Sequence, residues 1–323
     1  MADVTKTETL DDLYTTTWYN MRDHAIDNIF TATPFWFWLM HHKGKVRDVV
    51  GGRFIGIPLL RSKSSTVEWF TSYDQVDITP QVGLTTATEV WRYLSGSVAR
   101  SAIEEQQNSG KNQIFSLISS KLEQLQLSMI DKLETALFTA QTGNAMNSIL
   151  DLIPLDPSTG TIQGLDPSVE TWWQSKQQTF SGSFAVNGLK EFANFYNDVS
   201  IGADHPDLIM TDQTTFELYE AEMQQFLQIT TSGSAALGDA GFTSLRYKGA
   251  DIIWSANVTT GYAYFINSRY LELVRDPTFW FEMTEWKPVP EQPDARVAQV
   301  VCALNLVSNQ RRQLGVLTGI PTS

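Results

Sequence analysis

The sequence has almost no cysteine and no apolar run long enough to cross a membrane. Cys302 is the single cysteine among 323 residues, which excludes a framework of disulfides within the chain. It stands in the apolar run Val300–Leu304, where we expect a buried and inert thiol. The longest dense apolar stretch, Pro34–Met40, is far shorter than the roughly 20 residues that span a bilayer. Met1–Thr9 is polar and does not resemble a secretory signal, so a soluble intracellular protein is expected.

Positive charge is also scarce. The chain has 23 Lys and Arg residues against 36 Asp and Glu residues, which gives a net charge of −13. Proteins that bind nucleic acid usually have a basic surface patch and a high pI, so a nucleic-acid-binding protein is not expected here. A surface that merely lies beside DNA stays compatible with this charge. Apolar residues make up 42% and charged residues 18%, which is typical of a globular chain.

The common catalytic and phosphate-binding motifs are missing from the sequence. It contains no G-x-S-x-G, H-E-x-x-H, P-loop or G-x-G-x-x-G pattern. Asp204-His205-Pro206-Asp207 could hold an acid–base pair, but the proline favours a turn. We therefore predict no catalytic, cofactor-binding or metal-binding residues and no cofactor.

The four histidines do not form a convincing metal site. His41 and His42 are adjacent, so they cannot share one face of a regular helix or strand. A metal would need additional ligands, and only His24 and His205 remain as histidines. Solvated turn residues are the expected role of the pair.

Proline is absent between Pro80 and Pro154, so nothing in that stretch forces a helix to break. Apolar residues recur there every three or four positions, as on one face of a helix: Ile114, Ile118, Leu122, Leu125, Met129, Leu133 and Ala136. The opposite face is polar: Lys111, Gln113, Ser120, Glu123, Gln124, Asp131 and Glu134. We predict one helix over Asn112–Thr139, about 40 Å long at about 1.5 Å per residue and followed by a stop at Gly143. A core helix of an ordinary α+β domain would give the same pattern.

A projecting hairpin is predicted before this helix. Arg53–Leu60 and Val67–Tyr73 have strand patterns, and a polar tip, Arg61–Thr66, separates them. Two strands alone are marginal, so their apolar side chains are expected to need a partner. The aromatic run Phe35–Met40 is likewise expected to be poorly buried in a single subunit. A further strand is predicted over Thr88–Val98.

Shorter elements follow the long helix and then return to strands. The predicted elements are a helix over Asn187–Asn197, a strand over Asp207–Met210, a helix over Asp212–Gln228, a loop over Thr230–Gly241 and strands over Ala250–Ser255 and Gly261–Ile266. The N-terminal Thr9–Phe30 is predicted to be an amphipathic helix. Two last strands, Arg296–Val307 and Arg312–Leu317, are expected to pair with Thr88–Val98.

Several stretches, taken together in order, resemble one known family. They are the aromatic Thr33–Leu39 before the basic Lys43–Arg47, the hairpin of Gly51–Tyr73, the strand with its long helix, Asp207–Asp212 before a helix, and Tyr247–Ile253. This order is similar to that of tailed-bacteriophage major capsid proteins of the Hong Kong 97 fold, and it covers nearly the whole chain. The resemblance lies in the pattern of elements and not in catalytic signatures.

The resemblance implies an α+β, Hong Kong 97-like capsid fold with four segments. They are an N-terminal arm at 1–46, an extended β-hairpin or E-loop at 47–82, a peripheral domain with a spine helix at 83–142 and 268–323, and an axial domain at 143–267. The arm is too short for a fused scaffold, which implies a separate scaffold or none. Some relatives cross-link a hairpin lysine to a neighbour's asparagine. Lys63 lies near the predicted tip, where a solvated lysine is expected.

The function implied is that of a structural protein and not of an enzyme. The subunits would form hexamers and pentamers in the icosahedral head of a tailed phage, assembled in the host cytoplasm and located in the virion capsid. The head would enclose double-stranded DNA without sequence-specific binding, with portal and decoration proteins as further partners and no membrane. An encapsulin-like compartment and an enzyme with an unrecognised site are the alternatives.

Overall fold

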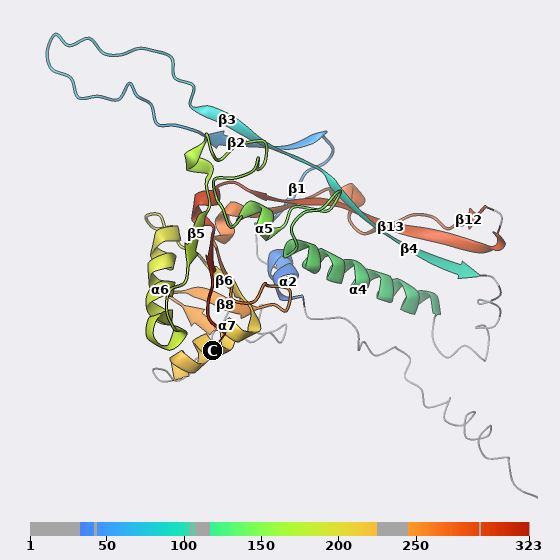
Figure 1. Ribbon diagram of the computed structural model, residues 1–323. Helices are drawn as coiled ribbons and strands as arrows, with labels where there is room; N and C mark the ends of the chain where they lie inside the picture. The colour runs from blue at the N-terminus through green and yellow to red at the C-terminus, as the bar shows by residue number, and fades with distance from the viewer. Residues whose placement is uncertain are drawn as a thin grey trace, which may run out of the picture. The chain divides into compact units, whose positions relative to one another are not determined.

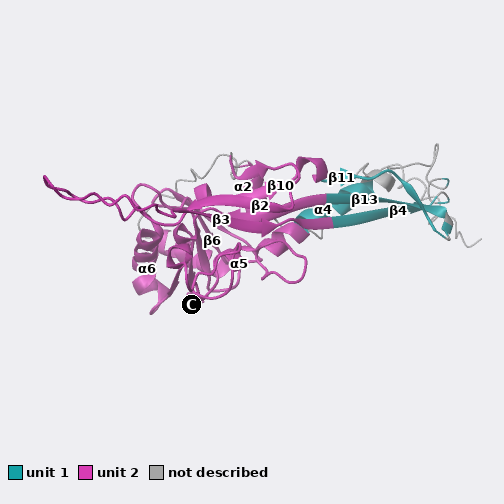
Figure 2. Ribbon diagram, turned by 90° about the horizontal axis from the view of Figure 1, so that it is seen from above, with its two compact units in different colours: residues 1–31, 95–131, 281–301 teal, residues 32–94, 132–280, 302–323 magenta. Residues whose placement is uncertain are grey.

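A computed structural model describes residues 33–41, 44–101, 103, 106, 117–224, 245–290 and 292–322 of the chain. It divides into two compact units, which Figure 2 shows in two colours. Unit 1 consists of Met1–Thr31, Ser95–Asp131 and Phe281–Val301, and unit 2 of Ala32–Leu94, Lys132–Trp280 and Cys302–Ser323. The predicted N-terminal helix and the predicted loop over 230–241 lie outside the described residues.

The strands of unit 1 pair with the long strand β13 (Gln292–Ser308), which continues into unit 2. Two short strands, β11 (Glu282–Met283) and β12 (Lys287–Val289), run antiparallel to it. β4 (Arg92–Ser101) pairs with β13 as well. The expected pairing of the strand before the long helix with the first of the two C-terminal strands is therefore confirmed.

The predicted long helix is α4, described over Leu117–Leu137. Its apolar face packs on β4 at a glycine. A Cβ atom built on Gly96 would lie 2.5 Å from Cδ1 of Leu125 and 3.2 Å from Sδ of Met129, so only glycine leaves room for these side chains. The predicted phase is confirmed for Leu125 and Met129. The expected stop at Gly143 is wrong, because the helix ends at Leu137.

The aromatic run forms the helix α2 (Pro34–His41), and it is buried within the chain. Phe35 and Leu39 are fully buried, and Trp38 is 1% exposed. The ring of Phe35 stacks on Trp38 and contacts Phe138. The expectation that this run is poorly buried in one subunit is therefore wrong. A helix that is apolar on all sides belongs in a core.

Glu134 of α4 holds the first turn of α2. Its carboxylate accepts hydrogen bonds from the backbone N–H groups of Trp36 (2.7 Å) and Phe35 (3.4 Å) and from the hydroxyl of Ser255 (3.3 Å). Glu134 is completely buried, so its predicted place on the solvent-facing side of the helix is wrong. The physical reason is that the first N–H groups of a helix lack partners within it, and a carboxylate satisfies them best.

A second, mixed sheet lies within unit 2. Its strand order is β5–β14–β9–β6–β8–β7. The strands are β5 (Lys176–Thr179), β6 (Leu208–Thr211), β7 (Leu245–Tyr247), β8 (Ala250–Trp254), β9 (Ala263–Ile266) and β14 (Gly315–Thr318). β6 pairs in parallel with β8, and β14 with β5; the other pairs are antiparallel. The strands predicted near 207–210, 250–255 and 261–266 are confirmed.

Two helices pack against this sheet, as Figure 1 shows. They are α6 (Phe184–Val199) and α7 (Gln213–Gln224), which confirms both predicted helices. Aromatic rings fill the space between helix and sheet. The ring of Phe192 contacts Phe184, Tyr219 and Phe265, with ring centroids 5.5–5.9 Å apart. Such contacts give this part of unit 2 a dense core of its own.

The last strand does not pair where the sequence predicted. β14 lies between β5 and β9 in the second sheet, whereas β13 pairs with β4. The expectation that both C-terminal strands pair with Thr88–Val98 is wrong for β14. All four residues of β14 are buried, and Val316 and Leu317 place apolar side chains on its two faces, which fits the interior of a sheet.

The remaining elements of unit 2 are short. β1 (Val46–Asp48) runs parallel to β10 (Leu271–Arg275), which pairs with the end of β13. The short helices are α5 (Ile149–Leu152), η2 (Thr171–Trp173), η3 (Ser268–Tyr270), η4 (Pro277–Phe279) and η5 (Arg311–Gln313).

Candidate assembly surface

A two-stranded hairpin forms the base of the most exposed part of unit 2. β2 (Phe54–Leu60) pairs antiparallel with β3 (Leu84–Val90), from Phe54 opposite Val90 to Leu60 opposite Leu84. The predicted partner strand, Val67–Tyr73, is wrong, because those residues form no strand. The predicted strand Thr88–Val98 is in fact divided between β3 and β4. Strand propensity at 67–73 identifies side chains that favour strands, but it does not identify a strand with which they could pair. Among the described residues, no strand lies beside 67–73.

One face of this hairpin belongs to the core of the subunit. Ile55, Ile57 and Leu59 alternate with exposed residues along β2 and are at most 7% exposed. They pack in one cluster with Trp173 and Val307. The expectation that the apolar residues of Arg53–Leu60 need a neighbouring subunit for burial is therefore wrong for these three residues, whereas Phe54 and Leu60 stay 50% and 79% exposed. Alternation of buried and exposed residues is typical of an antiparallel strand that has one face on a core and the other in solvent.

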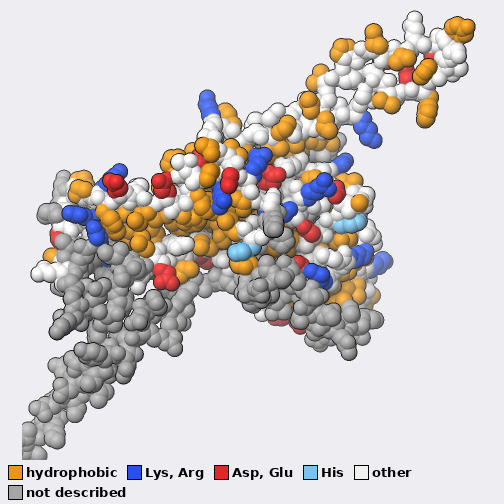
Figure 3. Space-filling model, turned by 180° about the vertical axis from the view of Figure 1, so that it is seen from behind, with side chains coloured by type: hydrophobic (Ala, Val, Ile, Leu, Met, Phe, Trp, Pro, Cys, Tyr) orange, Lys and Arg blue, Asp and Glu red, His pale blue; other side chains and the backbone are white. Residues whose placement is uncertain are grey.

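The residues between the strands, 61–83, form the distal loop, which extends beyond β2 and β3 in Figure 1. Its large apolar side chains are uncovered: Trp69 and Tyr73 are as exposed as in an extended peptide, at 102% and 104%, and Phe70 is 70% exposed. Val67, Ile78 and Val82 are at least 79% exposed. Figure 3 shows apolar side chains along the projecting segment. So much apolar surface marks a site of interaction.

The polar groups of the distal loop are satisfied locally. The Asp74 carboxylate accepts a hydrogen bond from the N–H of Thr71 (2.6 Å), and Asp77 accepts from the N–H and hydroxyl of Thr79 (2.9 and 2.6 Å). The hydroxyl of Thr79, followed by its N–H, lowers the pKa of Asp77. At the base, the N–H of Arg61 donates to the carbonyl of Gly83 (2.8 Å). Hydrogen bonds within local turns thus satisfy these polar groups, whereas the apolar side chains of the loop stay exposed to solvent.

A groove of about 550 Å³ lies beside the base of the distal loop. Arg61 at its wall pairs with Glu170 at 2.9 Å, and Glu170 also accepts from the indole of Trp172 at 2.6 Å. Lys63 and Arg312 line the same groove, and Lys63 is exposed. These contacts fix where the loop leaves the body. The role of Lys63 as a solvated side chain stays a prediction.

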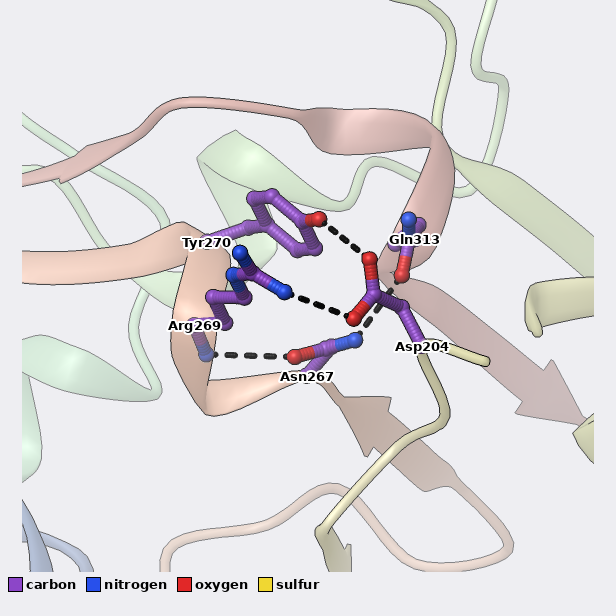
Figure 4. Close-up of polar contacts among 5 residues, drawn as sticks. All are labelled: Asp204, Asn267, Arg269, Tyr270 and Gln313. Atoms are coloured by element: carbon purple, nitrogen blue, oxygen red, sulfur yellow. Dashed lines mark hydrogen bonds and ion pairs between the residues drawn. The ribbon is translucent and has the colours of Figure 1, made fainter. Parts of the chain in front are cut away.

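The predicted turn over Asp204–Asp207 is wrong, because the turn lies between Ile201 and Asp204, which form a β-bridge, and the three residues after it are irregular. The carboxylates of the stretch have structural partners. Figure 4 shows the contacts of Asp204, which accepts from the Tyr270 hydroxyl (2.7 Å) and the Arg269 guanidinium (2.9 Å). Nearby, the amide of Asn267 accepts from the N–H of Arg269 and donates to Gln313. The Tyr270 hydroxyl is the main cause of the lowered pKa of Asp204, and Arg269 adds to it.

This cluster holds η3 against the 201–204 turn. Asp207 likewise accepts from the N–H of Ser268 (2.7 Å). The ring of His205 stacks on Tyr196, with centroids 5.9 Å apart. The direct contacts of Asp204 and His205 are therefore made with different residues, and the geometry favours a structural role for both over an acid–base pair.

The other residues singled out for chemistry also have structural surroundings. Cys302 is fully buried, and burial raises the pKa of its thiol to about 11, which confirms the buried thiol. His41 is exposed and stacks on Phe37; His42 lies outside the described residues. No group of three or more His, Cys, Asp or Glu residues in the described part of the chain is arranged to hold a metal ion. Among the described helices, none has the length and apolar character needed to cross a membrane.

Comparison with known proteins identifies the fold. No family model matches the chain, and no curated protein matches it. Among solved structures, the capsid asymmetric unit of cyanophage A-1(L) is 13% identical, with 93% of this chain and 96% of that chain covered and a TM-score of 0.68. The capsid of a native GTA particle is 10% identical, with 93% and 95% covered and a TM-score of 0.63.

A third similar structure is the holo-SrpI encapsulin complex of Synechococcus elongatus PCC 7942. It is 10% identical, with 96% of each chain covered and a TM-score of 0.59. At such identities the likeness concerns the fold alone. The mixed α+β capsid fold expected from the sequence is thereby confirmed over almost the whole chain.

Proposed function

We propose that this chain is the major capsid protein of a tailed phage, which assembles through hexamers and pentamers into an icosahedral head. The observation that carries the proposal is the likeness to phage capsid subunits along nearly the full length of both chains. The uncovered apolar side chains of the distal loop support the proposal, because repeated contacts between subunits would bury them.

The proposed division into parts follows the resemblance. Residues 1–46 act as an arm, 47–82 as the E-loop, 83–142 with 268–323 as the peripheral domain and 143–267 as the axial domain. β14 is the exception within this scheme, since it belongs to the sheet of the 143–267 segment. The buried α2 implies that the arm is anchored to the body from residue 34 onward.

The proposed contents of the head are double-stranded DNA held without sequence-specific contacts. A net charge of −13 supports this form of containment, because a strongly acidic subunit does not attract the phosphate backbone as a whole. Separate scaffold, portal and decoration proteins are the proposed partners. The protein would be assembled in the host cytoplasm and located in the virion capsid.

The subunit is proposed to have no catalytic role. Its titratable clusters, around Asp204 and around Glu134, hold elements together, and the proposal therefore assigns them to structure. An encapsulin-like compartment is the second candidate function, and the likeness to the SrpI encapsulin favours it. The two functions differ in what the shell contains.

Purified particles from the native source would separate the two functions. Particles are treated with DNase, opened, and analysed for nucleic acid and for co-purifying proteins. The capsid proposal predicts protected double-stranded DNA and a minor protein at low copy number that serves as a portal. Particles without protected DNA that contain one enzyme in many copies would instead support the compartment.

A further inference from the structure

A small apolar pocket opens on unit 2 between α4, β4 and the loop after α4. Its volume is about 90 Å³. Apolar side chains form most of the wall: Tyr93, Leu94, Leu133, Ala136, Ala145, Met146 and Leu304. Leu133 and Met146 are buried at its floor, whereas Tyr93 is 66% exposed at its mouth. This apolar wall is accessible to a group that comes from outside the chain.

The size of the pocket limits what can occupy it. Small-molecule sites usually measure about 300–1,000 Å³, so a cofactor or metabolite does not fit. A dry cavity of roughly 150 Å³ holds a benzene molecule. A smaller pocket that is open on one side suits one phenyl ring or one branched aliphatic side chain, with part of the group left at the mouth. Its size therefore favours a single side chain of a protein.

Two cationic side chains, Lys132 and Arg92, lie at the rim of the pocket and favour a negatively charged partner. Lys132 is exposed, and none of the described residues forms an ion pair with it. Arg92 donates one guanidinium hydrogen bond to the carbonyl of Gly143 (3.3 Å), while its Nε is buried without a hydrogen-bond partner among the described residues. Such a rim favours an apolar side chain that has a carboxylate close to it.

The distal loop has this combination. Phe70 is 70% exposed and lies two residues after Glu68, which is also exposed. In an extended segment, side chains two residues apart point to the same side. The indole of Trp69 is too large for a pocket of this volume. Phe70 is uncovered and the pocket is open in the same chain, so the two do not meet within one copy, and a contact between them needs a second copy.

We propose that the pocket receives Phe70 from the distal loop of a second copy, with Glu68 facing the Lys132 and Arg92 rim. The inference rests on the proposed shell function and deepens it by naming the two surfaces that meet. The exposure of the distal loop indicates only that it has some partner. The proposal adds which side chain of the loop makes the contact and which pocket it enters. Each copy would present one loop and one pocket, which is a head-to-tail contact and can close into rings.

Cysteine cross-linking tests the contact in the full chain. One variant carries Phe70→Cys, a second carries Ala136→Cys, and the two are mixed, assembled and oxidised. Cys302 is buried and should stay silent. We expect disulfide dimers in the mixed shells. The control replaces Ala136→Cys by Val186→Cys on the helix α6; Val186 is 79% exposed and so more accessible than the half-buried Ala136, and this pair should nevertheless give no dimers.

Charge reversal supplies a second measurement. Lys132→Glu and Glu68→Lys should each lower the yield of shells by roughly tenfold or more, because like charges would meet at every contact. The double variant should recover most of that yield. Circular dichroism of all three variants tests whether the subunit stays folded.

The outcomes separate this inference from the function on which it rests. Normal shell formation by the wild-type protein, together with mixed variant shells in which the cysteines at positions 70 and 136 cross-link no better than the Val186 control, would overturn the contact and leave the shell proposal intact. Failure of the wild-type protein to form any shell would overturn both. Efficient cross-linking together with charge-swap recovery would support the contact.

Discussion

Glu134 joins two elements that are distant in the sequence. Its carboxylate accepts from the first N–H groups of α2 and from the hydroxyl of Ser255, in a site closed to solvent. The periodic pattern places Glu134 on the polar side of the helix, because it distinguishes polar from apolar side chains and contains no information on their hydrogen-bond partners. The need for an acceptor arises from a helix terminus about 100 residues earlier, which no local pattern records.

Replacement of Glu134 by alanine should therefore destabilise the subunit. The change leaves two backbone donors and a hydroxyl buried without an acceptor, at a cost of about 1–3 kcal/mol for each unsatisfied group. We expect Glu134→Ala to lower the free energy of unfolding by about 3 kcal/mol, measured by urea denaturation. Glu134→Gln keeps one acceptor and should lose less. The exposed Glu123→Gln is the control, and an equal loss there would contradict the assigned role.

Asp204 should contribute to the pH dependence of stability. Its pKa in the folded state is lowered, first by the Tyr270 hydroxyl. A lowered pKa means that the stabilisation is fully present above the unfolded value, about 3.9, and is lost as the pH falls through the folded value. Asp204→Asn should therefore flatten the loss of stability below about pH 4. Denaturant unfolding between neutral and acid pH measures this, and an unchanged acid slope would contradict it. Tyr270→Phe should have a similar, smaller effect.

At the scale of elements, the hairpin shows what the sequence could and could not predict. The alternation of Ile55, Ile57 and Leu59 predicts β2 correctly, because one face of a strand is buried in the subunit core. Val67–Tyr73 is equally rich in residues that favour strands, yet it forms no strand in the single chain. Pairing depends on a partner at the right distance, and the chain supplies Leu84–Val90 instead. Amino-acid composition alone does not distinguish a strand from a loop whose apolar side chains would be buried by another molecule.

Removal of the distal loop should separate folding from assembly. Arg61 and Gly83 already face each other across the hairpin, so residues 62–82 can be replaced by an Asn-Gly turn. The core face of β2 is retained, and we expect a cooperative melt near that of the wild type but no shells by electron microscopy. The matched control keeps the loop length and changes Trp69, Phe70 and Tyr73 to serine, which should also prevent assembly. Shells from the truncated protein would show that the loop is not an essential contact.

The contact of α4 with β4 gives a second prediction for an element. Leu125 lies against Gly96, whereas Gln124 is exposed. Leu125→Asp would place a carboxylate in this apolar contact, at a cost of several kcal/mol unless it takes up a proton. We expect insoluble protein for Leu125→Asp and soluble protein for Gln124→Asp. Equal solubility and assembly of the two variants would mean that the helix phase is wrong.

At the scale of the whole molecule, the order of elements was more informative than any motif. The long helix without proline, the strand before it and the helix–strand alternation after residue 184 are all present in the structure. The membership of β14 was not predictable, because its apolar residues fit the interior of either sheet. The burial of α2 was predictable in principle, since Phe35, Trp36, Trp38 and Leu39 leave the helix no polar face.

Cryo-electron microscopy of the purified full-length protein tests the central claim most directly. The protein is examined over a range of concentration, salt and pH, with and without a co-expressed scaffold. The account predicts closed icosahedral shells of hexamers and pentamers in which the side chains of Trp69, Phe70 and Tyr73 are buried against neighbouring subunits. A protein that stays monomeric under all these conditions, or shells that leave the distal loop exposed to solvent, would contradict it.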